Sequence, residues 1–160
     1  MINSRKIEDL MIPAQSRFKA FLESCAVDPW LIGNGITVIL TCTLRDREAQ
    51  AALYAQGRTT KGKIVTNAKP GESWHQYGCA GDVLPLRNGK PIWGTSGNGI
   101  DEDPSDDDKD DLEAWQTVGK LGKRAGLEWA GDWKTFRELA HFQYTNGLTL
   151  AELQSGRVIA

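Results

Sequence analysis

The chain has 160 residues, which is enough for one domain with a buried core that needs no disulfide or metal to fold. It carries 19 basic and 21 acidic residues, and its formal net charge is -2. This balance provides no general attraction to nucleic acid or to an anionic membrane, so neither partner is expected. We expect a monomer with one domain over residues 1–160 and no second domain.

The N-terminus lacks the basic start, long apolar stretch and cleavage site of a secretory signal, and no later run is long enough to span a bilayer. We therefore expect synthesis in the cytoplasm and no membrane insertion. The three cysteines, Cys25, Cys42 and Cys79, are odd in number and widely spaced, which is typical of reduced core thiols. Cys79 lies between His75 and Asp82, and we interpret it as a small buried apolar residue.

The first half of the chain predicts helix, strand and helix in turn. Pro13 can open a helix with apolar residues at three-to-four spacing that ends near residue 24 or 25. The β-branched run Ile36–Cys42 predicts a buried strand, and Arg45 lies just beyond its end. A second helix is expected from Asp46 to Gly57, followed by a loop over residues 61–71.

The second half predicts a strand over residues 80–86 that carries Asp82, and then a long surface loop over residues 87–111. A helix capped by Ser105 is expected from Asp106 to about Gly126. Residues 127–133 and 140–144 have strand composition, with a short helical turn between them. The sequence T-L-A-E, residues 149–152, matches a capping box and predicts a short last helix.

The only two histidines, His75 and His141, each lie in a segment that could form half of a zinc site. With Asp82 they would give three protein ligands and an open fourth position, as in catalytic zinc sites, and the protein would then be a hydrolase. Gly78 and Gly81 would let the chain turn and return Asp82 beside His75. From spacing alone, two ordinary polar side chains in hydrogen bonds or turn caps remain an equal alternative.

Glu138 and Arg45 are the candidate catalytic residues. Glu138 precedes His141 by three residues, so it can take a proton from an attacking water and pass it to the leaving amine. Alternatively, it is a solvated glutamate at a helix end. Arg45 can hold a substrate carboxylate or an oxyanion, or it can pair with an acidic neighbour at the surface.

Two motifs in the chain resemble one known family. The pattern S-x-H-x-x-G-x-A-x-D, residues 73–82, is followed far downstream by an acid-x-x-H at residues 138–141. This resembles the zinc peptidases that group vancomycin-resistance D-alanyl-D-alanine carboxypeptidases with phage L-alanyl-D-glutamate endopeptidases. Further likeness lies at residues 45–50, 53–59, 64–68 and 126–133, so it spans most of the chain. At position 81 this chain has glycine, where members of that family commonly have a bulkier apolar residue.

The resemblance implies an α+β fold, a small antiparallel sheet with helices packed on it, as in D-Ala-D-Ala peptidases and the hedgehog domain. It implies Zn2+ held by His75, Asp82 and His141, with Glu138 as the base. By the same likeness Arg45 would contact the substrate or its oxyanion. Two weaker candidates for substrate binding are Ser73 and Gln50.

The function implied is that of a phage endolysin cutting the L-alanyl-D-glutamate bond of the peptidoglycan stem peptide. The protein would act on the bacterial wall after holin-type release from the infected cell. One alternative is a D-alanyl-D-alanine carboxypeptidase or dipeptidase with the same site. Another is a non-catalytic zinc-bearing binding module, as in hedgehog.

The acidic run of residues 101–111 allows one more interpretation. Asp101, Asp103 and Ser105 have the alternating start of a calcium loop. The sixth position, where such a loop turns at glycine, is Asp106, and the twelfth is Leu112. We therefore favour a solvated loop and a helix start.

Overall fold

The computed structural model describes residues 1–93 and 108–160, without the side chains of residues 108 and 109. Contacts divide the chain into two compact units, and each combines segments that are distant in sequence. Unit 1 comprises Met1–Ser16, Leu40–Asp82 and Gln143–Ala160. Unit 2 comprises Arg17–Ile39 and Val83–Phe142. The expectation of a single domain over residues 1–160 stays a prediction.

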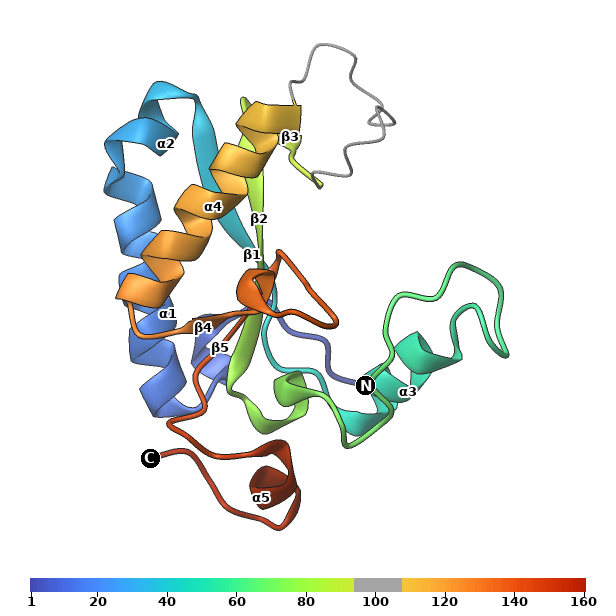
Figure 1. Ribbon diagram of the computed structural model, residues 1–160. Helices are drawn as coiled ribbons and strands as arrows, with labels where there is room; N and C mark the ends of the chain where they lie inside the picture. The colour runs from blue at the N-terminus through green and yellow to red at the C-terminus, as the bar shows by residue number, and fades with distance from the viewer. Residues whose placement is uncertain (94–107) are drawn as a thin grey trace. The chain divides into compact units, whose positions relative to one another are not determined.

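The elements alternate between helices and short strands (Figure 1). The helices are α1 (Ile12–Val27), α2 (Pro29–Gly33), α3 (Arg47–Ala55), α4 (Asp108–Arg124) and α5 (Leu150–Gln154). The strands are β1 (Ile36–Cys42), β2 (Ala80–Arg87), β3 (Lys90–Pro91), β4 (Glu128–Trp129) and β5 (His141–Gln143). Their order in the sheet is β1-β2-β5-β4, and β3 pairs with β2 in antiparallel register, Leu86 opposite Pro91. The expected α+β class with a small antiparallel sheet is confirmed.

Aromatic rings form the core of unit 2. Phe142 of β5 lies 4.6 Å, between ring centroids, from Phe21 of α1 and 6.2 Å from Trp129 of β4. On α4, a Cβ atom at Gly122 would lie only 2.3 Å from the Phe142 ring, so the helix approaches the strand at a residue without a side chain. Helices α1 and α4 therefore both pack on β5, as Figure 1 shows.

Unit 1 is organised around the chain that follows β1. Residues Ile2 and Ser4 of the N-terminal segment exchange backbone hydrogen bonds with residues 43–46. Helix α3 begins directly afterwards, because the side chain of Asp46 accepts a hydrogen bond from the Ala49 N–H at 2.8 Å. The predicted capping box of α5 is confirmed, with Thr149 and Glu152 each bonded to the other's backbone.

The structure corrects several of the expected elements. Residues 29–33 form α2, which Asp28 caps, although no helix is expected there. The surface loop predicted from residue 87 is wrong at its start, since Arg87 still belongs to β2 and residues 90–91 form β3. Helix α4, which begins at Asp108, agrees with the helix expected from Asp106. The strand predicted over residues 127–133 is only the two residues of β4, followed by a 3-10 turn at Ala130–Asp132.

Asp111 is the clearest departure from a solvated acidic run. It is buried, and its carboxylate lies 2.8 Å from the Arg87 guanidinium, because a buried charge needs an opposite one beside it. The calcium-loop residues Asp101, Asp103 and Ser105, and the Ser105 cap, lie outside the described residues. No helix among the described residues is long and apolar enough to cross a membrane.

Candidate metal centre

His75 is carried by a 3-10 turn, Trp74–Tyr77, which follows the loop predicted over residues 61–71. Gly78 ends this turn with a positive φ of 65°, which favours glycine. A Cβ atom there would also lie 3.2 Å from the backbone nitrogen of Met11, so the close approach requires the glycine of the motif. The turn leaves His75 only 4% exposed.

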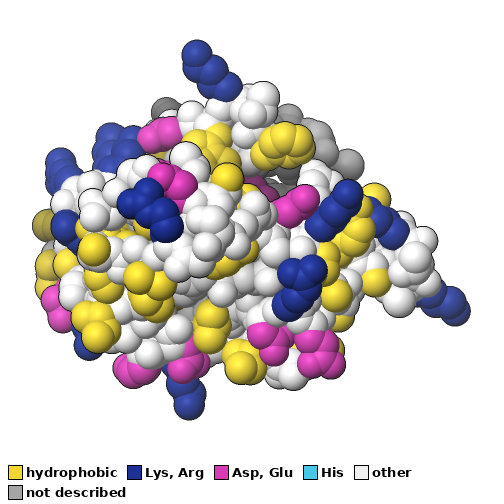
Figure 2. Space-filling model, turned by 90° about the horizontal axis from the view of Figure 1, so that it is seen from below, with side chains coloured by type: hydrophobic (Ala, Val, Ile, Leu, Met, Phe, Trp, Pro, Cys, Tyr) yellow, Lys and Arg dark blue, Asp and Glu magenta, His cyan; other side chains and the backbone are white. Residues whose placement is uncertain are grey.

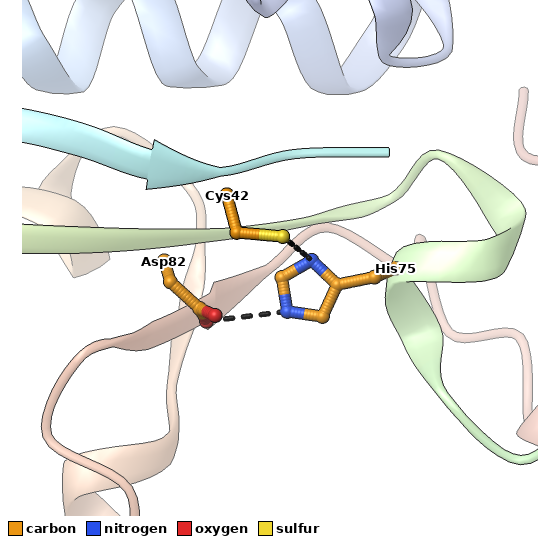
Figure 3. Close-up of side chains that lie close together, drawn as sticks. All are labelled: Cys42, His75 and Asp82. Carbon is orange, nitrogen blue, oxygen red and sulfur yellow. Dashed lines mark hydrogen bonds and ion pairs between the residues drawn. The ribbon is translucent and has the colours of Figure 1, made fainter. Parts of the chain in front are cut away.

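Both nitrogens of the His75 ring face hydrogen-bond acceptors, and Figure 3 shows the acceptor at Nε2, the carboxylate of Asp82. Nδ1 lies 2.7 Å from the Thr43 carbonyl oxygen, and Nε2 lies 3.2 Å from Oδ1 of Asp82, the third residue of β2. A carbonyl can only accept, so Nδ1 must carry a proton and donate it. In a neutral imidazole this leaves a lone pair on Nε2 that points toward the carboxylate.

Two acceptors cannot face each other stably in a buried place unless a cation lies between them. Burial alone lowers the pKa of His75, but the charge and hydrogen bond of Asp82, with a smaller contribution from Cys42, raise it to about 10. A divalent metal can take the place of that proton, since the Nε2 lone pair and the carboxylate are both suitable ligands. The residues present therefore fit a zinc ion.

Arg45 contacts both His75 and Asp82. Its backbone N–H donates to the His75 carbonyl at 3.2 Å, and its Nη2 lies 3.9 Å from Oδ2 of Asp82. Its Nη1 donates to Oε1 of Gln50 at 3.0 Å. Nε of Arg45 is buried without a hydrogen-bond partner among the described residues. The side chain as a whole is 13% exposed, so a substrate carboxylate or oxyanion could reach the accessible part of the guanidinium but not Nε.

Gln50 has no exposed surface. Besides accepting from Arg45, it donates from Nε2 to the Ala68 carbonyl at 2.7 Å, so both ends of its amide are engaged within the protein. This arrangement positions Arg45 and accounts for Gln50 without a substrate. Ser73 is buried directly before the turn that carries His75. Direct substrate binding by Ser73 or Gln50 stays a prediction.

Cys42, which the sequence indicates only as a core thiol, lies beside the pair. Its Sγ lies 3.7 Å from Nδ1 of His75 and accepts a hydrogen bond from Nη2 of Arg45 at 3.2 Å. The potential ligand atoms of Cys42, His75 and Asp82 all lie within 4.8 Å of one another. In Figure 3 the thiol is on the Nδ1 side of the ring and Asp82 is on the Nε2 side. Sequence spacing could not indicate this contact, because 33 residues separate Cys42 from His75.

The other two predicted site residues belong to unit 2, where they lie close together. Nδ1 of His141, the first residue of β5, lies 4.0 Å from Oε2 of Glu138. His141 is 5% exposed, whereas the Glu138 side chain is 60% exposed. The ring of Trp133 covers His141, with centroids 5.8 Å apart. A buried imidazole is thus paired with a carboxylate that can reach solvent.

Comparisons with known proteins agree with this fold. A model of the M15 peptidase family, described as D-alanyl-D-alanine carboxypeptidase, matches residues 66–144. The peptidoglycan L-alanyl-D-glutamate endopeptidase CwlK of Bacillus subtilis (strain 168) is 35% identical over 138 residues, 86% of this chain and 78% of the relative. These matches define the class of protein as a metallopeptidase, and the chain belongs to the M15 family.

Solved structures show the same fold at low sequence identity. The Serratia marcescens L-Ala D-Glu endopeptidase ChiX aligns with a TM-score of 0.56 and 16% identity, over 92% of this chain and 86% of that chain. The LD-carboxypeptidase LdcB aligns with a TM-score of 0.53 and 20% identity, over 97% of this chain and 77% of that chain.

Proposed function

We propose that this chain is a zinc-dependent peptidoglycan endopeptidase that hydrolyses the L-alanyl-D-glutamate bond of the stem peptide. The observation that carries the proposal is the pairing of His75 Nε2 with Asp82 at 3.2 Å, with Nδ1 held by Thr43. The substrate is suggested by CwlK, a peptidoglycan L-alanyl-D-glutamate endopeptidase 35% identical to this chain.

His141 is proposed as the third ligand. Chain connectivity supports this choice, because the Val83 N–H donates to the Ala140 carbonyl at 3.0 Å within unit 2. Asp82 directly precedes Val83 in the chain, and His141 directly follows Ala140. A zinc ion held by two imidazoles and one carboxylate would polarise the scissile carbonyl and lower the pKa of water to about 7.

Two side chains then perform the proton transfer and charge stabilisation. Glu138, exposed and next to His141, accepts a proton from the attacking water and later delivers it to the amine of the leaving D-glutamate. Arg45, whose side chain is 13% exposed, offers the accessible part of its guanidinium to the oxyanion or to a carboxylate of the stem peptide. Cys42 and Gln50 hold the guanidinium in place for this contact.

Digestion of purified peptidoglycan by the zinc-loaded protein tests the proposal, with mass spectrometry of the new termini. We expect new N-terminal D-glutamate and glycan strands that keep only L-alanine. Release of D-alanine without other cleavage would instead identify the D-alanyl-D-alanine carboxypeptidase or dipeptidase alternative. Zinc binding without any cleavage would identify the binding module.

Action as a phage endolysin after holin-type release is also proposed. Expression in a bacterial cell with and without a holin tests it. Lysis only in the presence of the holin is the expected result, and lysis in neither case would contradict it.

A further inference from the structure

The loop that follows α3 concentrates positive charge in a chain whose net charge is -2. Between Ala49 and Gly71 the sequence contains four basic residues and no acidic one. They are Arg58, Lys61, Lys63 and Lys69. We call residues 57–69 the cationic loop. The charge balance of the whole chain hides this local excess.

The cationic loop is held in shape by its own hydrogen bonds. Gly57, with a φ of 75°, donates from its N–H to the Thr60 carbonyl at 2.9 Å. The Arg58 guanidinium donates to the Tyr54 carbonyl at 2.7 Å and the Thr66 carbonyl at 3.1 Å, and it covers the Tyr54 ring. Arg58 is therefore a structural residue of the loop, and the three lysines carry its available charge.

The outer surface of the cationic loop combines lysines with aliphatic side chains. Ile64 and Val65 are adjacent and expose 56% and 54% of their surface, and Lys61, Lys63 and Lys69 are also exposed. None of these lysines has an ion-pair partner in the part of the chain that the structure describes. At the right-hand side of Figure 2, where α3 and this loop lie, Lys and Arg side chains stand beside hydrophobic ones.

The cationic loop is joined directly to the candidate site within unit 1. Nε2 of Gln50 donates to the Ala68 carbonyl at 2.7 Å, and Oε1 of the same side chain accepts from Arg45. A ligand whose reacting bond lies at Arg45 and Asp82 would therefore have its continuation near the base of this loop.

From this arrangement we infer that the cationic loop binds the carboxylates of peptidoglycan stem peptides, with Lys61, Lys63 and Lys69 as the contacts. The inference rests on the proposed function and deepens it. A stem peptide with an L-alanyl-D-glutamate bond carries a methyl group and a carboxylate side by side, which suit lysines beside an exposed Ile64–Val65 pair. The loop would supply binding to the anionic polymer, while the chemistry stays with His75, Asp82 and Glu138.

The test uses the triple substitution Lys61→Gln, Lys63→Gln and Lys69→Gln in the full-length chain. Binding to purified sacculi stripped of wall teichoic acid is measured by cosedimentation, in a Glu138→Gln background that prevents digestion. We expect binding about tenfold weaker and less sensitive to salt than without the triple substitution, because exposed ion pairs are individually weak and screened. The matched control removes three exposed lysines elsewhere, with the substitutions Lys6→Gln, Lys19→Gln and Lys120→Gln. It has the same net charge as the triple variant, and it should bind sacculi as tightly as the chain with intact lysines.

Further arms identify the ligand group. Carbodiimide amidation removes the negative charge of the wall carboxylates. The chain with intact lysines should then bind the amidated sacculi only as weakly as the triple variant binds untreated sacculi. The inference would be overturned if the triple variant bound sacculi as well as the chain with intact lysines, or if the control variant lost as much binding as the triple variant. It would also be overturned if binding required teichoic acid, or if the chain preferred phosphatidylglycerol vesicles to sacculi. Cleavage of the same sacculi by the parent chain is scored separately, so that binding without cleavage contradicts only the proposed function.

Discussion

The Nε2 atom of His75 lies 3.2 Å from the Oδ1 atom of Asp82, while Nδ1 of the same ring is committed to the Thr43 carbonyl. This relationship places a buried imidazole lone pair and a carboxylate opposite each other, so a bound cation stabilises the arrangement.

The substitution Asp82→Asn should abolish stoichiometric zinc binding, because the amide keeps the shape of the carboxylate but loses its charge. Metal content after dialysis, measured by mass spectrometry, checks this. The substitution Glu23→Gln removes an exposed carboxylate and should leave zinc content unchanged. Full zinc content in the Asp82→Asn protein would remove Asp82 from the ligand set.

The substitution Glu138→Gln should lower kcat by about 10²–10⁴-fold, the usual contribution of a general acid–base group. Zinc content should stay the same, since Glu138 is proposed as a base and its side chain is 60% exposed. Kinetics on a soluble stem-peptide fragment and metal analysis of the same sample provide the two readings. An unchanged kcat would leave Glu138 as a surface residue.

Cobalt substitution should show that Cys42 stays outside the metal coordination. Sγ lies on the Nδ1 side of the His75 ring, away from Asp82, and accepts from Arg45. The Co2+ protein should therefore lack thiolate-to-metal charge-transfer absorption, and Cys42→Ala should keep its metal. That variant should raise KM or lower kcat, because Arg45 loses one of its contacts. A charge-transfer band that disappears in Cys42→Ala would instead make Cys42 a ligand.

The stability of α3 should depend on pH through its cap. Hydrogen bonding from the Ala49 N–H, with a further bond from Ile2, lowers the pKa of Asp46. A carboxyl group whose folded pKa is depressed contributes stability that is present above its unfolded pKa, about 3.9, and is lost as the pH falls through the folded value.

Thermal melts of the parent and of Asp46→Ala, compared from neutral pH to about pH 2, check this expectation. The difference in Tm should be largest at neutral pH and should shrink in acid. A difference that stays constant with pH would mean that the Asp46 charge does not contribute to the cap.

Local signals explain why several elements could be predicted. The strand Ile36–Cys42 is a single β-branched run, α3 has its cap at Asp46, and α5 has a capping box. Each signal acts over a few residues, so the sequence alone indicates it. The 3-10 turn that carries His75 has no comparable signal, because its geometry depends on the packing of Gly78 against Met11.

By itself, the sequence determined the chemistry available to this protein: the spacing of His75 and Asp82, the acid three residues before His141, and the charge excess after α3. Only the tertiary structure decided that Cys42 lies against His75, that Gln50 joins Arg45 to the cationic loop, and that Asp111 is buried against Arg87. The physical reason is separation along the chain. Hydrogen bonds and ion pairs between residues far apart in sequence form only when the whole backbone has folded, and no local propensity encodes them.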